Sequence, residues 1–203
     1  MARPLAFDET RALEAAMDRF WGHGYAATSV RDLADCAGIG GTSLYNTFGD
    51  KRALFLRALD HYGETRMRVR LARFAAMDDA RAAIAAFLGE TVERSLGAGG
   101  ERGCFIVNTA LDMAPHDPDV ARRIAARLGE IEQFLLARVA AAQAAGAVDP
   151  AREASDLARL LLAAMLSIRV LARARPERDL LEAIARAALD ALGPAPARTA
   201  RSI

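Results

Sequence analysis

The stretch between Thr28 and Phe48, TSVRDLADCAGIGGTSLYNTF, places the tightest constraint on the fold. Four apolar residues at i, i+3, i+4 and i+7 predict a short helix with one apolar face: Val30, Leu33, Ala34 and Ala37. Thr28 or Ser29 can cap its first turn, because a hydroxyl there accepts hydrogen bonds from free backbone N–H groups. Gly38 then ends the helix, because the next residue often needs a positive φ, which glycine adopts without strain.

A second short helix follows the glycines, with apolar residues spaced to pack on the first helix: Leu44, Tyr45 and Phe48. Two short helices joined by a glycine-containing turn of three or four residues form a helix-turn-helix. The second helix of such a pair can enter the major groove of DNA. The stretch therefore predicts a DNA-reading element near the N-terminus.

The residues on both sides of this element resemble a known family. The run 20–34, FWGHGYAATSVRDLA, resembles the opening of the TetR family of bacterial regulators. The run 37–55, AGIGGTSLYNTFGDKRALF, is similar to that family's recognition helix and the start of its fourth helix. The resemblance implies a DNA-binding unit of three helices, a helical ligand-binding body, and a dimer formed by the last two helices of each subunit.

Candidate DNA contacts follow from residue chemistry and from the resemblance. Asparagine can pair with adenine through two hydrogen bonds, and serine and threonine hydroxyls reach bases or phosphates. The candidates in the second helix are Gly41, Thr42, Ser43, Tyr45, Asn46 and Thr47. The resemblance implies phosphate contacts from Thr28, with Ser29 beside it, from Tyr45, and from Lys51, the only lysine in the chain. The alternative for Tyr45 is a half-buried ring in the small core.

The low net charge indicates that DNA is recognised by a few individual residues rather than by an overall positive surface. The net charge is +1, and the first 55 residues carry six Lys+Arg against seven Asp+Glu. Many family members carry a lysine where this chain has Gly41, and an aromatic residue or histidine where it has Thr47. The surface predicted to face the groove is therefore small and neutral, and binding must depend on a few cations and on helix N-termini.

The rest of the chain also reads as helix. Of the 203 residues 53% are hydrophobic, many of them Ala and Leu, and no alternating run of β-branched residues predicts a strand. Apolar spacing predicts further helices over about 8–22, 50–74, 79–96, 102–111, 117–145, 157–171 and 176–192. Asp50 is expected to cap the second of these helices. The fold class is therefore all-α, with about nine helices. We expect a helix-turn-helix domain at 1–50, a ligand-binding and dimerisation domain at 51–193, and a disordered tail at 194–203.

Two of these segments carry more specific expectations. Segment 102–111 is apolar nearly all round, which predicts a buried helix. The arginines in the second half of the 50–74 helix predict a solvated face: Arg66, Arg68, Arg70 and Arg73.

The last two helices have wider apolar faces than a single layer can cover. One face carries Leu157, Leu160, Leu161, Ala164, Met165, Ile168 and Leu171, and the other carries Leu180, Leu181, Ile184, Ala188 and Leu192. This surplus indicates either self-association or closure of the monomer core. The family resemblance implies the first, a homodimer through these two helices.

Phenylalanine and methionine residues on helices expected to converge predict an adaptable apolar cavity in the body. The candidates are Met67, Phe74, Phe87, Phe105, Met113, Phe134 and Met165. Asn108, Thr109 and Asp112 lie on the same helix as Cys104 and can orient a ligand there. Ordinary core packing is the alternative for each of these residues.

The two cysteines have different interpretations. Cys104 follows Arg102 and Gly103 at a helix start, where the helix dipole and a cation favour the thiolate. The segment RGCFIVNTAL at 102–111 resembles that of a family subgroup in which a cysteine here reacts with electrophiles or oxidants. A buried, inert thiol is the alternative for Cys104. Cys36 is expected to pack on the apolar side of its helix.

The predicted function is a ligand-responsive transcriptional repressor, released from a palindromic operator in double-stranded DNA by a small apolar or electrophilic effector. The alternatives are an activator or co-repressor-dependent regulator of the same fold, and an all-α interaction module or enzyme with a degenerate helix-turn-helix. An enzyme is disfavoured because His23, His61 and His116 have neither metal-ligand nor catalytic-triad spacing. We expect no cofactor, no metal and no membrane span, since the most apolar run, 160–168, is too short to cross a bilayer, and we expect a cytoplasmic location.

Overall fold

The computed structural model describes residues 8–193, and within that range it contains helices, turns and connections but no strand. The elements are α1 (Glu9–His23), α2 (Val30–Ala37), α3 (Gly41–Phe48), α4 (Lys51–Tyr62), η1 (Gly63–Arg68), α5 (Val69–Ala75), α6 (Ala80–Leu96), η2 (Gly100–Arg102), α7 (Phe105–Asp112), α8 (Pro118–Ala144), α9 (Ala154–Ala174) and α10 (Arg178–Asp190). Since α4, η1 and α5 follow one another without a break, the described chain holds nine helices and the short turn η2. The predicted all-α class is confirmed. The predicted tail at 194–203 lies outside the described residues.

Capping residues begin and end the N-terminal helices where the sequence predicts. Ser29 caps α2: its hydroxyl accepts from the Asp32 N–H at 3.1 Å, and the Asp32 carboxylate accepts from the Ser29 N–H at 2.8 Å. Gly38 follows α2 with a φ of 66°. Asp50 caps α4 by accepting from the backbone N–H of Ala53 at 2.7 Å. These local hydrogen bonds set the boundaries of the helix-turn-helix.

Contacts divide the chain into two compact units. Among the described residues, the first unit comprises 8–69 together with Cys104–Arg127, and the second comprises Arg70–Gly103 together with 128–193. The predicted domains at 1–50 and 51–193 follow sequence motifs rather than contacts. That division stays a prediction.

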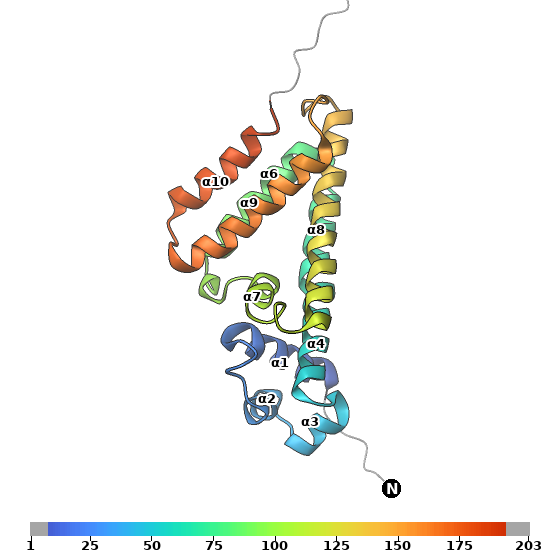
Figure 1. Cartoon of the computed structure of the whole chain (residues 1–203), viewed down its shortest axis with the longest axis vertical. Helices are drawn as coiled ribbons and strands as arrows, with labels where there is room; N and C mark the ends of the chain where they lie inside the picture. Colours follow the sequence, from blue (N-terminus) through green and yellow to red (C-terminus); the bar gives the residue numbers. More distant parts are fainter. Residues whose placement is uncertain (1–7, 194–203) are drawn as a thin grey trace, which may run out of the picture. The chain divides into compact units, whose positions relative to one another are not determined.

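An aromatic cluster forms the centre of the first unit. Phe55 of α4 packs edge-to-face on Phe20 of α1 and on Phe105 of α7, with ring centroids 5.1 and 5.8 Å apart. Tyr62 continues the cluster, 5.6 Å from Phe105 and 5.3 Å from Trp21. The cluster joins α1, α4 and α7, and α2 and α3 lie beside α1 and α4 (Figure 1).

A π-helical segment, η1, interrupts the long helix predicted at 50–74. Its first residue, Gly63, lies against the guanidinium of Arg127, so that a Cβ added at Gly63 would lie 2.4 Å from Arg127 Nε. The Arg127 side chain is 9% exposed, and its Nη2 lies 3.4 Å from the Asp60 carboxylate and 3.3 Å from that of Glu64. Glycine at this position makes room for a buried, paired arginine of α8.

In the second unit, α6 packs against α9 and α10, which also pack on each other (Figure 1). Phe87 of α6 lies between two other rings, 5.8 Å from Phe74 and 5.4 Å from Phe134. The Arg70 guanidinium lies 4.3 Å from the centre of the Phe87 ring and donates to the Glu90 carboxylate at 2.9 Å. Its side chain is 14% exposed. The predicted solvated face is therefore wrong at Arg70, because a carboxylate and a ring face on α6 compensate for its burial.

One side of α7 is open, unlike the prediction for segment 102–111. Phe105, Ile106 and Val107 are buried, but Leu111 is 64% exposed. The predicted all-round burial is therefore wrong, because the other described residues cover only one side of this helix. Arg102, predicted inside the same helix, belongs instead to η2.

The contact at Gly63 leads to a stability prediction. Gly63→Ala should lower the free energy of unfolding by about 1–2 kcal/mol, because the new methyl group displaces a buried guanidinium from its two carboxylates. For a chain of this size each kcal/mol lowers the melting temperature by about 2–4 °C. The matched control is Gly129→Ala in α8, where a Cβ meets nothing within 4 Å. This control should raise stability by about 0.5–1 kcal/mol through helix propensity; equal effects in thermal melts would contradict the packing role of Gly63.

Candidate nucleic-acid interface and ligand pocket

The helix α3 buries two apolar anchors and presents polar residues. Leu44 and Phe48 are each 3% exposed, as their spacing predicts. Tyr45 is 49% exposed, so its predicted packing on the first helix is wrong and half of its surface is open to a partner. Thr42 and Asn46 are exposed, and Gly41, Ser43 and Thr47 are partly exposed. The N-cap is Gly40, which has no side chain to bond the first-turn N–H groups. The predicted second helix of the helix-turn-helix therefore exists as a short, uncharged surface with hydroxyl and amide groups.

The two residues before α2 have structural roles. Thr28 is 0% exposed, and its hydroxyl donates to the Gly24 carbonyl at 2.7 Å. Its side chain is thus not placed to reach a phosphate, which corrects the prediction: burial and this hydrogen bond close the connection between α1 and α2. Ser29 is exposed, and hydrogen bonds from its backbone N–H and its hydroxyl lower the pKa of Asp32. A DNA contact from Ser29 stays a prediction.

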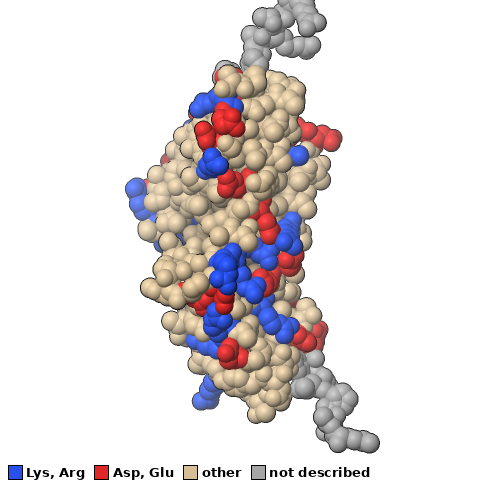
Figure 2. Space-filling view, turned by 45° about the vertical axis from the view of Figure 1, so that its right-hand side comes forward, with Lys and Arg blue, Asp and Glu red and all other residues tan. Residues whose placement is uncertain are grey.

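Two cations lie at helix starts near α3. Lys51 begins α4, with Nζ 4.2 Å from the centre of the Tyr25 ring. Arg31 of α2 has a side chain 91% exposed, 3.8 Å from Asp35. Arg31 was not among the predicted contacts, although its place in the first turn of α2 could have indicated a phosphate contact. On the face drawn in Figure 2, basic and acidic side chains are interspersed, which agrees with the prediction of local rather than global charge.

Arg52 joins the start of α4 to the start of α8. Its Nε and Nη2 donate to the two carboxylate oxygens of Asp117 at 2.7 and 2.8 Å, and Nη2 also donates to Asp119 at 2.7 Å. These hydrogen bonds from Arg52 lower the pKa of Asp117 to about 2. Asp117 also accepts from the N–H groups of Asp119 and Val120 at 3.0 and 3.3 Å. One carboxylate therefore caps α8 and holds α4.

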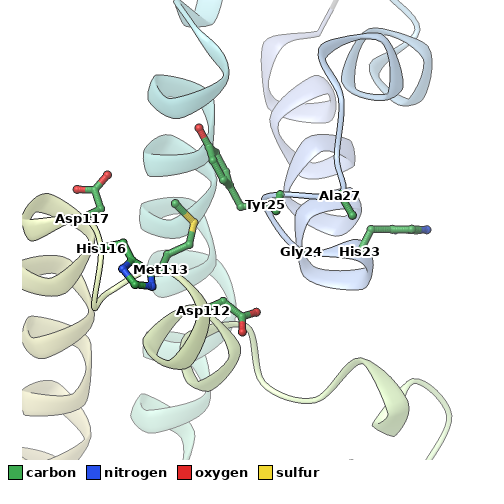
Figure 3. A pocket seen from close by; sticks show the side chains of 9 residues that line it. His23, Gly24, Tyr25, Ala27, Asp112, Met113, His116 and Asp117 are labelled. Atoms are coloured by element: carbon green, nitrogen blue, oxygen red, sulfur yellow. The ribbon is translucent and has the colours of Figure 1, made fainter.

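A cavity of about 590 Å³ lies in the same unit. It is lined by His23, Gly24, Tyr25, Ala26 and Ala27 from the end of α1 and its connection to α2, and by Asp112, Met113, His116 and Asp117 from the end of α7 and its connection to α8. Figure 3 shows these two groups of residues on two sides of the hollow. Ligand pockets in proteins have volumes of about 300–1,000 Å³, so its size suits a small organic molecule.

The predicted ligand-binding residues are divided between the two units. Asp112 and Met113 line the cavity. Met67, Cys104, Phe105 and Asn108 belong to the first unit, and Phe74, Phe87, Phe134 and Met165 belong to the second. The phenylalanine rings pack on other rings in the two aromatic clusters described above, which is the alternative of ordinary core packing. Ligand contacts from these eight residues stay predictions.

The two cysteines lie in different surroundings. Cys104 is the N-cap residue of α7 and is partly exposed, with Sγ 3.9 Å from the Tyr62 hydroxyl. Its predicted place at a helix start is confirmed. Cys36 is exposed, and its thiol donates to the Leu33 carbonyl at 3.3 Å. The predicted packing of Cys36 is wrong, because the side chain turns back to its own helix at the margin of the apolar face.

Two further findings concern residues 8–193. No three His, Cys, Asp or Glu side chains in this range are grouped so that they could hold a metal ion. None of the helices in this range is long and apolar enough to cross a membrane.

In the first unit, a short polar helix is anchored by buried residues and follows a glycine-containing turn. This arrangement places the protein in the class of helix-turn-helix DNA-binding regulators. Residues 12–58 match the family described as bacterial regulatory proteins, tetR family, and residues 80–188 match the tetracyclin repressor-like C-terminal domain. The chain belongs to the TetR family of transcriptional regulators.

Known relatives are regulators of the same kind. The uncharacterized HTH-type transcriptional regulator YezE of Bacillus subtilis (strain 168) is 31% identical over 183 residues, covering 90% of this chain and 94% of YezE. The HTH-type transcriptional repressor ComR of Escherichia coli (strain K12) is 31% identical over 168 residues, covering 78% of this chain and 76% of ComR. A solved structure of a cysteine mutant of the TetR family regulator CifR, complexed with 26-bp double-strand operator DNA, is 33% identical with a TM-score of 0.81, and covers 94% of this chain and 99% of CifR. These relatives support a DNA-binding transcriptional regulator.

The ion pair of Asp117 leads to a prediction about pH. Its folded pKa of about 2 lies below the ordinary value of 3.8, so the stabilisation is complete above pH 3.8 and is lost as the pH falls towards 2. Asp117→Asn should lower stability at neutral pH and flatten the fall of the urea midpoint below about pH 4. Asp78→Asn, at an exposed position between α5 and α6, is the control and should follow the wild-type profile. The same acid dependence in Asp117→Asn and wild type would contradict this assignment.

Proposed function

We propose that this protein is a homodimeric, ligand-responsive transcriptional repressor that binds a palindromic operator in double-stranded DNA. The observation that carries the proposal is the polar surface of α3, held out by two buried anchors, Leu44 and Phe48. ComR is a repressor by name, and CifR was solved on operator DNA. Two copies of α3, one from each subunit, would enter successive major grooves about one helical turn apart.

Base reading would come from hydrogen bonds, because α3 (GTSLYNTF) carries no charge. Asn46 is the residue best suited to an adenine, since its amide both donates and accepts. Thr42, Ser43 and Thr47 offer hydroxyls, and Gly41 lets the backbone approach the groove closely. Tyr45, Ser29, Lys51 and Arg31 would contact phosphates and set the register.

The outward faces of α9 and α10 support the dimer. Leu160 and Val170 on α9 are 43% and 44% exposed, and Ala163 and Ser167 between them are also exposed. These four positions recur at intervals of three and four residues, so they form one stripe along the helix. On α10, a second apolar stripe consists of Ala187, which is exposed, and of Leu180, Ala183 and Ile184, which are partly exposed. Two adjacent helices with small and apolar exposed residues suit a four-helix bundle with a second copy.

Control by a small apolar or electrophilic effector would be a population shift. A ligand that binds better to the DNA-free arrangement lowers operator affinity by the ratio of its affinities for the two states. A co-repressor-dependent regulator would show the opposite effect, because its effector would raise operator affinity. An activator would act on transcription only while it is bound to the operator. Gel shifts on the DNA upstream of the reading frame, with and without effector, separate these cases. The protein would act in the cytoplasm, where the DNA is, and we propose no enzymatic activity for it.

Three substitutions test the interface. Asn46→Ala should weaken operator binding by about 1–3 kcal/mol per subunit and relax specificity at one base pair of each half-site. Tyr45→Ala and Lys51→Ala should weaken binding to all sequences. Lys51→Ala should also reduce the slope of log K against log salt by about two, because each subunit of the dimer loses one phosphate contact. The measurement is a gel-shift titration at several salt concentrations.

The control for Asn46→Ala is Gln133→Ala, another exposed amide, which lies on α8. It should leave operator affinity unchanged. Thermal melts check that each variant is folded. Unchanged affinity in folded Asn46→Ala and Lys51→Ala proteins would remove α3 and the start of α4 from the interface.

A charge in the α9 stripe tests the dimer. Leu160→Glu and Val170→Glu should each shift the protein from dimer to monomer in sedimentation velocity, because a buried unpaired carboxylate is strongly unfavourable. Operator affinity should fall with dimerisation, since two half-sites are then no longer bound together. The control is Val69→Glu, at a residue 63% exposed at the start of α5. A dimer that tolerates both α9 substitutions would place the interface elsewhere.

A further inference from the structure

We propose that the cavity at the ends of α1 and α7 is a binding site for a small organic cation that carries an apolar group. The site deepens the proposed function, on which its regulatory consequence rests, by naming a place and a chemical class for an effector. Binding itself is independent of DNA and can be measured on the free protein.

The electrostatic field in the cavity favours a cation. Two helices end there, α1 at His23 and α7 at Asp112, and the C-terminal end of a helix carries a partial negative charge. The helix α8 also begins there, but its positive end is capped by the Asp117 carboxylate, which accepts from the N–H groups of Asp119 and Val120. Asp112 adds a full negative charge at the end of α7, where it is exposed and forms no ion pair with residues 8–193. None of the nine lining residues is a lysine or an arginine.

The other titratable side chains of the cavity do not cancel this charge. Arg52 occupies both carboxylate oxygens of Asp117. His23 Nε2 lies 3.2 Å from Nη1 of Arg19, and a guanidinium can only donate, so this imidazole nitrogen accepts the hydrogen bond. His116 also lines the cavity. Asp112 is therefore the carboxylate in the cavity that is available to a ligand.

The rest of the lining suits an apolar group attached to the cation. The Tyr25 ring and the Met113 thioether project into the region between the two groups of lining residues (Figure 3). Ring faces attract cations, and thioethers adapt to apolar groups of varied shape. Ala26 and Ala27 complete the lining with small side chains. At about 590 Å³ the cavity has room for an aromatic ammonium ion.

An occupant of this site would contact the residues that hold the start of α4. The Lys51 ammonium group lies over the Tyr25 ring, and Arg52 donates hydrogen bonds to Asp117. A bound cation beside Tyr25 competes with Lys51 for the ring and repels its ammonium group. Because Lys51 is a proposed phosphate contact, occupation of the cavity should lower operator affinity.

The test uses the full chain, with benzyltrimethylammonium as the cationic probe and benzoate as an anion of similar size, in calorimetric titrations at about pH 8. We expect the probe to bind and benzoate not to bind. Asp112→Asn should weaken probe binding about tenfold, because the Coulombic attraction between the ammonium charge and the carboxylate is lost. Asp112→Glu, which keeps the charge, should bind the probe within about threefold of wild type. Asp78→Asn, an exposed carboxylate outside the cavity, should bind it as wild type does.

The site is overturned by equal probe affinity in wild type and Asp112→Asn, by benzoate binding as tightly as the probe, or by no probe binding at millimolar concentration. Thermal melts without probe check that the Asp112 variants are folded. Operator binding is measured separately by gel shift without probe, so a protein that binds no operator contradicts the proposed function while calorimetry still decides on the cavity. If the operator is bound and the probe binds through Asp112, unchanged operator affinity in saturating probe overturns the regulatory link.

Discussion

Edge-to-face packing of Phe55 between Phe20 and Phe105 is the contact on which the first unit depends. Phe55 and Phe20 are each 1% exposed and Phe105 is 2% exposed, so α1, α4 and α7 share one buried centre. Pairs of this geometry contribute about 0.5–1.5 kcal/mol beyond the burial of their area. This centre explains why α7, far along the chain, belongs to the same unit as the helix-turn-helix. The end of α7 is consequently placed by core packing rather than by a loop, and this packing gives the cavity its shape.

Electrostatics in the DNA-binding region is mainly internal. Arg19 pairs with Asp32, Arg52 with Asp117, and Arg57 with Glu9. Each pair fixes one helix against another but leaves fewer cations for phosphates. The free energy of operator binding should therefore depend less on salt than in strongly basic proteins, where each neutralised phosphate contributes about −0.9 to the slope. The hydroxyl and amide groups of α3 should then determine the discrimination between operator sequences.

Sequence predicted best those features that a few neighbouring residues determine. The caps at Ser29 and Asp50 and the positive φ at Gly38 involve partners within four residues, so the helix boundaries followed from local chemistry. Family resemblance added the class of protein, and apolar spacing added the number of helices. Within the candidate site, the exposed residues of α3 were predicted because a helical period separates them from Leu44 and Phe48.

Features that join distant segments were not predicted. Arg70 was predicted to be a surface residue, because no residue near it in sequence indicates its contacts with the Phe87 ring and the Glu90 carboxylate. The π-helical segment at Gly63 depends on Arg127, which contacts it only in the folded chain. The cavity was missed for the same reason: apart from Asp112 and Met113, its lining comes from the end of α1 and from turns, where residues show no periodic pattern in sequence.

The size of the proposed regulation can be bounded from the contacts involved. A cation–π contact at a partly exposed site contributes about 0.5–1 kcal/mol. Loss of the Lys51–Tyr25 contact in both subunits of a dimer would thus remove about 1–2 kcal/mol, which lowers operator affinity by roughly 5- to 30-fold. Thermodynamic linkage requires operator DNA to weaken the two cation-binding steps of the dimer by the same total factor, which is about 2- to 5-fold for each site. A cation that lowers operator affinity by far more than this product would therefore be acting outside the cavity, for example by screening phosphates directly.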